Sequence, residues 1–355
     1  MASLKDVARE AEVSIATASR VLNNDLTLSA ATSTKERVIQ AAKKLNYLPA
    51  AKKRKKNNPG QPKQELGLIM FCSKDQEYED EYFMSIRRGI ETACNQFNMT
   101  ISAIVRQGED LIENANLNSF DGLFVVGNIS PDLVSELYAK NDRVIFIDES
   151  PETEKFDSVT SNFFKATNQL MEHLFSHGHK QIGYIGGHEI IHTPSADPDL
   201  QEIDNIEKLR FLPYKNFINR HGSFNEDHIY LGEWSTEAGY NIMKQAIEKK
   251  TLPSAFMIAS DPLAIGAIRA LHEAGLRVPE DLSIVSFNDI EIAKYMNPPL
   301  TTAKVYAEEM GKTAVKLLIE RFEGRQVPAK VIHPCHIQIR ESCTSVKSPS
   351  DPMSV

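Results

Sequence analysis

Five consecutive cationic side chains stand in the segment YLPAAKKRKKNNPG, which covers residues 47–60. They are Lys52, Lys53, Arg54, Lys55 and Lys56. Residues 1–63 contain 13 Lys and Arg against 5 Asp and Glu, which leaves 27 against 43 for the rest of the chain. A basic N-terminal part on an acidic body indicates that the N-terminal part contacts a polyanion and the body does not. For the five cations themselves, a passive solvated linker is the alternative.

Hydrophobic periodicity divides the basic part into three short helices. In SLKDVAREAEV, apolar residues recur at i, i+3, i+4 and i+7, and IATASRVLN follows a turn at Glu12 and Val13. A third apolar stripe contains Val38, Ile39, Ala42 and Leu45. Two short helices about a tight turn, braced by a third, form the helix-turn-helix arrangement.

The second of these helices carries side chains suited to reading double-stranded DNA. A recognition helix presents its N-terminal residues to base edges in the major groove. Arg20 can donate two hydrogen bonds to a guanine, which discriminates by about 1–3 kcal/mol, and Ile15 and Ala16 can contact thymine methyl groups. Short polar residues suit phosphates, which position a helix without reading sequence; these are Ser14, Thr17, Ser19 and Asn23. The alternative is a core role for Ile15 and a solvated Arg20.

From residue 65 onward, short apolar runs alternate with amphipathic stretches. The runs predicted as strands are 66–72, 100–106, 122–127, 143–148, 181–187, 228–233, 254–260 and 282–287. Continuous apolar strands separated by helices indicate parallel sheets covered on both faces, and the length of this part indicates two lobes. No run is apolar enough to span a membrane, and MASLKDVAREAEV is not typical of a signal peptide.

Several blocks resemble a known family. LKDVAREAEVSIATASRVLNN, LSAAT and ERVIQAAKKLNYLP closely resemble the DNA-binding headpiece of the lactose-repressor (LacI/GalR) family over residues 3–49. HGHKQIGYIGG, SDPLAIGAIRALHEAGLRVPEDLSIVSFND and PPLTT resemble the sugar-binding core that this family shares with periplasmic sugar-binding proteins. The resemblance implies an α/β fold: a helix-turn-helix headpiece followed by a two-lobed core with parallel sheets.

This resemblance also suggests domain boundaries. We expect a headpiece at 1–49, a basic hinge at 50–64, a sugar-binding and dimerisation core at 65–340 and a disordered tail at 341–355. The segment LTLSAATSTKERV, which precedes the third helix, is two residues longer than in most family members, and this difference concerns the cap of that helix and not the fold.

In such a core the ligand lies between the lobes, where the carboxyl ends of the strands meet. The residues matched to the family's effector pocket are Tyr82, Asp148, Arg210, Trp234, Ser260 and Asn288. Asp148 can accept hydrogen bonds from sugar hydroxyls, Arg210 can donate them, and the ring of Trp234 can lie on a pyranose. As alternatives, Asp148 and Asn288 cap loops and Tyr82 is a core aromatic.

The resemblance implies a cytoplasmic, homodimeric transcriptional repressor that binds a pseudo-palindromic operator and is released by a small sugar. The block EYEDEYF with SIRRGIE is most similar to regulators of galactose or β-galactoside genes, which favours galactose or a galactoside. One alternative is a corepressor or phosphoprotein partner that tightens DNA binding. A transport-type sugar-binding protein and an enzyme are weaker alternatives, because the first needs no DNA-binding head and the second lacks a recognisable catalytic motif.

In this family the segment after Pro49 is a hinge that folds into a short helix on operator DNA, where a leucine wedges into the minor groove. This chain has no leucine between Pro49 and Glu65. An apolar wedge unstacks a base step, whereas lysines gain affinity by releasing counterions from phosphates. We therefore expect a steep salt dependence and less operator kinking than in a leucine-hinged relative.

Histidines and cysteines are the remaining residues with chemical potential. His173 and His177 stand at i, i+4 with His179 nearby, but no cysteine or acidic residue follows at a metalloprotease spacing. The four cysteines are scattered without a CxxC pair. We therefore expect no metal, no cofactor and no disulfide framework. Residues 188–205 are predicted to form a long polar loop.

Overall fold

The computed structural model describes residues 4–22, 32–45, 63–106, 116–151, 154–192, 202–206 and 208–346. The chain divides into two compact units, Met1–Pro62 and Lys63–Val355. Each has a hydrophobic core, and each is described by itself. Within the described residues, no helix has the length and apolar character needed to cross a membrane.

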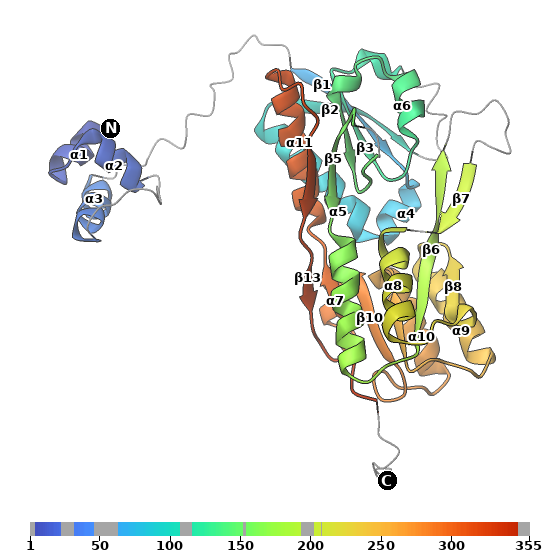
Figure 1. Ribbon diagram of the computed structural model, residues 1–355. Coiled ribbons are helices and arrows are strands. Elements are labelled where there is room, and N and C mark those ends of the chain that lie inside the picture. Colours follow the sequence, from blue (N-terminus) through green and yellow to red (C-terminus); the bar gives the residue numbers. More distant parts are fainter. Residues whose placement is uncertain are drawn as a thin grey trace. The chain divides into compact units, whose positions relative to one another are not determined.

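The first unit is a bundle of short helices. They are α1 (Leu4–Glu10), α2 (Ile15–Leu22) and α3 (Thr32–Lys44) (Figure 1). Val7, Ala18 and Val38, one from each helix, are fully buried against one another. The tight turn between α1 and α2 contains Glu12 with φ 55°, in the left-handed region. The predicted helix-turn-helix arrangement is confirmed.

One residue of the predicted third stripe is misplaced. Ile39 is 45% exposed, whereas Ala41, which was not predicted to face inward, is buried. The buried face of α3 therefore contains Val38, Ala41 and Ala42 and is rotated slightly from the predicted one.

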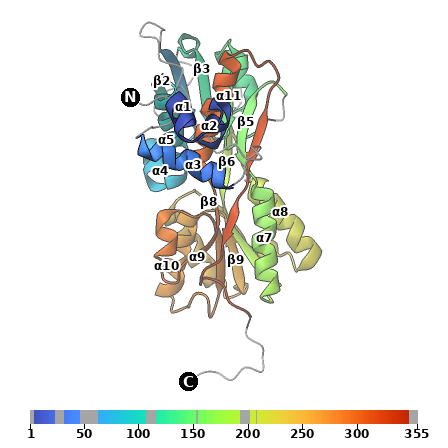
Figure 2. The ribbon, with the colours of Figure 1, turned by 90° about the vertical axis from the view of Figure 1, so that its left-hand side faces the viewer.

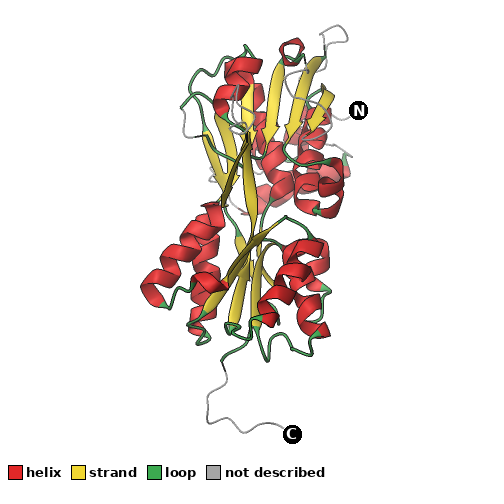
Figure 3. Cartoon of the chain, turned by 90° about the vertical axis from the view of Figure 1, so that its right-hand side faces the viewer, coloured by secondary structure: helices red, strands yellow, loops and turns green. Residues whose placement is uncertain are grey.

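The second unit consists of two α/β lobes (Figure 3). The sheet of the first lobe has the order β12-β5-β4-β3-β1-β2, with every neighbouring pair parallel. Its strands are β1 (Gln64–Met70), β2 (Met99–Arg106), β3 (Gly122–Val126), β4 (Val144–Ile147), β5 (Asp157–Ser161) and β12 (Lys330–His333). Its helices are α4 (Lys74–Glu79), α5 (Glu81–Gln96), α6 (Pro131–Leu137) and α11 (Ala307–Phe322).

The sheet of the second lobe has the order β13-β11-β10-β9-β6-β7, with β8 paired to β6. Its strands are β6 (Ile182–His192), β7 (Glu202–Ile206), β8 (Ile229–Gly232), β9 (Ala255–Ile258), β10 (Ser283–Asn288), β11 (Thr301–Lys304) and β13 (His336–Gln338). Figure 2 shows α7 (Phe163–Ser176) and α8 (Lys208–His221) on one side of this sheet, and α9 (Thr236–Glu248) and α10 (Asp261–Glu273) on the other.

Each run predicted as a strand forms one, with ends shifted by one or two residues at most sites. The predicted loop at 188–205 is wrong, because β6 continues to His192 and pairs antiparallel with β7. The strands β5, β11, β12 and β13 were not predicted. They are short and partly polar, and β5 reads DSVTS although most of it is buried. Hydrogen bonds to buried polar groups, rather than apolar side chains, stabilise β5 and β11 in the interior, whereas β12 and β13 are exposed or partly buried.

Three connections join the lobes. They pass through Asn162 after β5, Val305 after β11 and Pro334 after β12. Because each lobe is completed by chain segments that come back from the other, the lobes can move relative to each other only by bending at these crossings.

The predicted start of a disordered tail at 341 is too early. Ser342 is fully buried. Its Oγ donates a hydrogen bond to the Ile284 carbonyl at 2.6 Å and accepts one from Thr301 N at 2.8 Å. The chain from 341 to 346 is thus part of the second lobe, and residues 347–355 lie outside the described residues.

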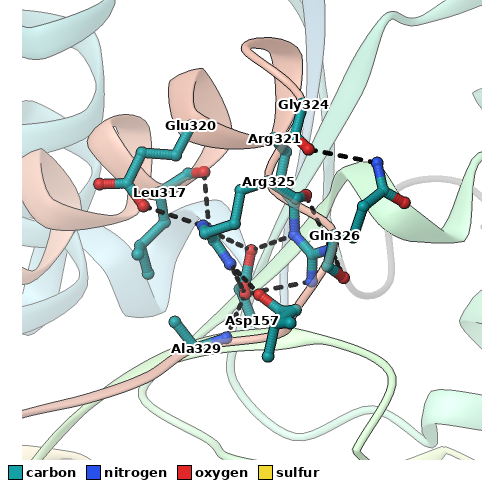
Figure 4. Close-up of polar contacts among 9 residues, drawn as sticks. Asp157, Leu317, Glu320, Arg321, Gly324, Arg325, Gln326 and Ala329 are labelled. Carbon is teal, nitrogen blue, oxygen red and sulfur yellow. Dashed lines mark hydrogen bonds and ion pairs between the residues drawn. The ribbon is translucent and has the colours of Figure 1, made fainter.

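A buried carboxylate fastens α11 to the first sheet (Figure 4). Asp157 on β5 accepts from Arg321 Nε at 2.8 Å, from both terminal nitrogens of Arg325 at 2.8 Å and from Ala329 N at 2.6 Å. Burial by itself would raise the pKa of Asp157, but the hydrogen bonds from Arg325 and Arg321 outweigh it and lower the pKa. Removing one partner of such a buried pair typically costs about 3–5 kcal/mol.

Candidate functional site

The exposed face of α2 carries the residues predicted to read DNA. Ile15 is 48% exposed and Arg20 is exposed, whereas Ala18 and Val21 on the opposite side are buried in the core. The alternative of a core role for Ile15 is therefore wrong. Thr17 and Ser19 are partly buried beside this face.

Ser14 precedes the first residue of α2 and caps this helix. Its Oγ accepts a hydrogen bond from Thr17 N at 3.0 Å and lies 2.9 Å from Thr17 Oγ1, which satisfies a backbone donor at the helix start. The side chain of Ala16 is not described, and Asn23 and 52–56 lie outside the described residues. Contacts of all these residues with DNA stay predictions.

A cavity of about 260 Å³ lies between the two lobes of the second unit. It is lined by residues that follow β1, β3 and β4 in the first lobe and β8, β9 and β10 in the second. All six residues predicted for an effector pocket line it, namely Tyr82, Asp148, Arg210, Trp234, Ser260 and Asn288. Residues that follow parallel strands are candidates for a ligand site (the strand-end rule). The rule holds here because the carboxyl ends of parallel strands face the same crevice.

Asp148 and Tyr82 form one polar pair of this cavity. The Tyr82 hydroxyl donates to Asp148 Oδ1 at 2.5 Å. Burial raises the pKa of both groups, and the positive charge of Arg210 offsets part of this effect for Asp148. Asp148 has φ 77°, a left-handed conformation that few residues other than glycine adopt. Tyr82 is 5% exposed, so it is both a core aromatic and a cavity residue.

Asn288 and Ser260 face the cavity from the second lobe. Asn288 ends β10 with φ 109°, and its buried Oδ1 has no hydrogen-bond partner among the described residues. An unpaired buried carbonyl oxygen is costly unless a ligand or water supplies a donor. The Ser260 hydroxyl caps α10 by accepting from Leu263 N at 3.5 Å, so part of its bonding capacity is already used.

Arg210 lies among aromatic rings on the same side of the cavity. Its guanidinium carbon is 3.9 Å from the centre of the Phe163 ring, 5.5 Å from Phe287 and 5.6 Å from Trp234. Arg210 itself is 7% exposed, because α8 carries it into the interior. Stacking against rings keeps the planar guanidinium in one orientation, so that it can donate to a ligand.

Trp234 is fixed against the edge of β6. Its Nε1 donates to the His188 carbonyl at 2.9 Å. A side chain at Gly187 would stand 2.1 Å from the ring, so only glycine allows the indole to lie this close to the strand. The ring therefore presents a fixed apolar surface to the cavity.

Sequence reasoning missed part of the lining. The further residues are Phe71, Cys72, Ser73, Gln76, Asp80, Phe83, Gly127, Asn128, His188 and Glu233. Ser73 and Asn128 come shortly after β1 and β3, so the strand-end rule would have found them. Gln76 and Asp80 carry no such signal, because α4 and α5 reach the cavity only in the folded lobe.

Asp80 is the most notable of the missed residues. It caps α5 by accepting from Tyr82 N at 2.9 Å. Burial raises its pKa to about 6, an effect that the Tyr82 backbone and Arg210 partly oppose. The lining thus contains three carboxyl groups, those of Asp80, Asp148 and Glu233, beside the guanidinium of Arg210.

A helix-turn-helix unit with an exposed recognition face, followed by two lobes around a polar cavity, defines a ligand-responsive DNA-binding regulator. The chain belongs to the lacI family of bacterial regulatory proteins. It matches this family over residues 3–50 and a periplasmic binding protein-like domain over residues 171–343. The resemblance seen in the sequence is confirmed, and the chain is a transcriptional regulator rather than an enzyme.

Similar proteins match this chain over nearly its whole length. The chain is 41% identical to the HTH-type transcriptional repressor MelR of Bacillus subtilis (strain 168), covering 97% of this chain and 98% of that protein. It is 36% identical to the HTH-type transcriptional regulator GanR of the same strain, covering 94% and 96%. A lac repressor dimer bound to operator and the anti-inducer ONPF is 25% identical, with a TM-score of 0.66 over 97% and 99% of the two chains.

Proposed function

We propose that this chain is a cytoplasmic, homodimeric repressor of a sugar-utilisation operon that leaves its operator when a neutral sugar, galactose or a galactoside, enters the cavity between the lobes. The headpiece covers about residues 1–49, the basic hinge 50–64 and the core 65–346. The observation that carries the proposal is the cavity itself, which combines a flat indole, a buried guanidinium and carboxylates in one chain with a helix-turn-helix.

The chemistry of the lining favours an uncharged polyol. Sugar hydroxyls both donate and accept hydrogen bonds, so they can pair with Asp148, Asn288 and Arg210 at once. The apolar face of a pyranose can lie on Trp234. A phosphorylated sugar fits poorly, because among the described residues that line the cavity Arg210 is the one arginine or lysine, beside three carboxyl groups.

Galactose or a galactoside is favoured among neutral sugars by the block EYEDEYF with SIRRGIE, which is similar to regulators of such genes. This block carries Asp80 and Tyr82 of the lining. The Asp80 carboxylate can accept hydrogen bonds and the Tyr82 hydroxyl can donate them. Both residues belong to the first lobe, whereas Arg210 and Trp234 belong to the second. A sugar would therefore bridge both lobes.

The proposed mechanism couples this bridge to DNA. Closing the lobes around a sugar bends the three crossings near Asn162, Val305 and Pro334 and changes the disposition of the first lobe, to which the hinge is joined. In a dimer, two headpieces bind half-sites of a two-fold operator only when their spacing is correct. Because the coupling is a free energy shared by both sites, operator DNA weakens sugar binding by the same factor.

Trp234 provides a direct test, because it is the only tryptophan of the chain. Galactose, galactosides and unrelated sugars are titrated onto the full chain while the tryptophan emission is recorded. We expect a saturable change with galactose or a galactoside, and release of operator DNA in a gel-shift titration over the same concentration range. No response to any sugar in both assays would refute the proposal, and tighter operator binding would show a corepressor instead.

A variant assigns the response to the cavity. Arg210→Lys keeps the charge but loses the planar fork, so we expect sugar affinity to fall by roughly tenfold or more while operator binding without sugar is retained. Arg220→Lys, at an exposed position of the same helix, is the matched control and should behave as the wild type. Equal sugar affinity in the two variants would contradict the assigned role of Arg210.

A further inference from the structure

Two histidines at the end of α7 meet a cysteine from the far end of the chain. His173 lies in the last turn of α7, His177 caps the C-terminal end of this helix, and Cys343 lies in the C-terminal segment of the second lobe. One ligand atom from each of the three residues lies within 4.8 Å of the other two. No third ligand stands near the two histidines in the sequence, so no metal was expected, whereas the fold brings a cysteine to them from the C-terminal segment.

Backbone and side-chain bonds hold the two segments together. Val346 N donates to the His177 carbonyl at 2.9 Å. On the other side of Cys343, Ser342 is buried and bonded to Ile284 and Thr301. The cysteine therefore lies between two anchored residues, and its place beside α7 does not depend on a bound ion.

The third nearby histidine serves as an internal comparison. His179 Nδ1 lies 2.9 Å from Ser254 Oγ and His179 Nε2 lies 2.9 Å from the Thr344 carbonyl. Both of its ring nitrogens are thus used within the protein, as in a purely structural histidine. It belongs to the same corner of the lobe but offers no free ligand atom.

His173 and His177 differ from His179 in the hydrogen bonds of their ring nitrogens. His173 Nε2 is buried and has no hydrogen-bond partner among the described residues. His177 Nδ1 lies 2.8 Å from the His173 carbonyl, so it donates there and leaves Nε2 as a free lone pair. A backbone bond at one ring nitrogen is the usual way in which proteins orient the other toward a metal.

The electrostatics of His173 and Cys343 agree with metal binding. Burial lowers the pKa of His173, and the neighbouring His177 lowers it further, which favours the neutral imidazole that can bind a metal. Burial raises the pKa of the Cys343 thiol to about 11, which a hydrogen bond from Ser283 partly opposes. A thiol of this kind stays inert until a cation displaces its proton.

We propose that His173, His177 and Cys343 form a zinc-binding site that joins the C-terminal segment to α7. Two imidazoles and a thiolate are ligands that Zn²⁺ prefers, and a water completes a tetrahedron. Bond lengths of about 2.0 Å to nitrogen and 2.3 Å to sulfur place ligand atoms about 3.3–3.6 Å apart. The present separations therefore require a closure of about 1 Å, which side-chain rotation can supply.

Cobalt is the spectroscopic probe for this site. The full chain, purified under reducing conditions and freed of metal, is titrated with Co²⁺. We expect one equivalent to bind, with tetrahedral visible bands and a thiolate-to-cobalt charge-transfer band, both displaced by Zn²⁺. In Cys343→Ser the charge-transfer band should disappear, and in both Cys343→Ser and His177→Gln the zinc affinity should fall more than roughly 100-fold, since even second-shell partners contribute 10–100-fold.

Matched variants decide the outcome. Cys335→Ser removes another partly buried thiol, whose pKa burial also raises to about 11, and His272→Gln removes an exposed histidine on α10. Both should bind metal as the wild type does. Zinc should also raise the unfolding temperature of the wild type but not of Cys343→Ser. No charge-transfer band in the wild type, or one that survives in Cys343→Ser, would overturn the proposal.

Discussion

At the scale of single residues, the cavity is framed by two strand-end side chains with unusual backbone conformations. Asp148 in the first lobe and Asn288 in the second have φ 77° and φ 109°. Residues in such conformations cost folding free energy and concentrate at functional sites. Each lobe contributes one such residue, and the two lie on facing sides of the same cavity. This arrangement supports a single ligand that contacts both residues.

Asp261 offers a residue-scale prediction beside the cavity. This carboxyl is fully buried, accepts from Thr302 Oγ1 at 2.8 Å and from Ile290 N at 3.0 Å, and burial raises its pKa to about 7. The folded state therefore binds its proton more tightly than the unfolded state, whose pKa is near 3.8. This group's contribution to stability is largest below about pH 4 and is lost as the pH rises through 7.

We expect Asp261→Asn to change stability in a pH-dependent way. Relative to the wild type, the variant should gain up to about 4 kcal/mol between pH 4 and pH 8, because asparagine does not ionise. Calorimetric unfolding over this pH range measures the difference, and Asp142→Asn at an exposed position is the control. A difference between Asp261→Asn and wild type that does not vary with pH would contradict this assignment.

At the scale of elements, each lobe is closed by a pair of helices that touch at glycines. A side chain at Gly89 of α5 would stand 2.1 Å from the Glu308 carbonyl of α11, and one at Gly311 of α11 would stand 2.2 Å from the Ile86 carbonyl. In the second lobe, Gly239 of α9 and Gly266 of α10 make equally close approaches. The helices pack backbone against backbone, so even a methyl group must separate them.

We expect Gly311→Ala to destabilise the core although alanine is the better helix former. The helix gains about 1 kcal/mol in propensity, but overpacking typically costs about 1–3 kcal/mol, and a clash with backbone lies at the upper end. Urea unfolding measures the net loss. Lys316→Ala, exposed on the same helix, is the control and should leave stability nearly unchanged. An equally stable Gly311→Ala would show that the two helices can move apart freely.

At the scale of the whole molecule, charge is separated along the chain. The N-terminal 63 residues carry a net charge of +8 and the remainder −16, from the counts of 13 against 5 and 27 against 43. A polyanion is attracted to one end and repelled by the other. This separation of charge favours contact of DNA with the N-terminal part rather than with the body.

The basic hinge should appear in the salt dependence of operator binding. Replacing Lys52, Lys53, Lys55 and Lys56 with alanine should reduce the slope of log K against log salt by up to about 3–4, since each phosphate contact contributes about 0.9. Affinity measured at several salt concentrations gives the slope. Alanine at the exposed body residues Lys208 and Lys250 is the control. An unchanged slope in the hinge variant would make the five cations a passive linker.

Much of the fold and of the cavity could be predicted from the sequence. Helical periodicity and a tight turn indicated the headpiece, and apolar runs indicated the central strands, because burial on both faces demands apolar residues at every position. Asp148, Ser260 and Asn288 followed from standing just after such runs. The short strands β11 and β13 were missed, because they contain polar residues and are stabilised by long-range hydrogen bonds that no local pattern records.

The sequence by itself determined the short helices of the headpiece and which strand ends face the crevice, because these depend on local periodicity and on the geometry of parallel sheets. The class of protein followed from its resemblance to the lactose-repressor family. Only the tertiary structure decided which distant residues meet. Asp80 reaches the cavity through α5, Asp157 binds two arginines of the α11 end, and Cys343 stands beside His173 and His177. Such contacts form when separate segments pack on one core, so no spacing along the chain encodes them.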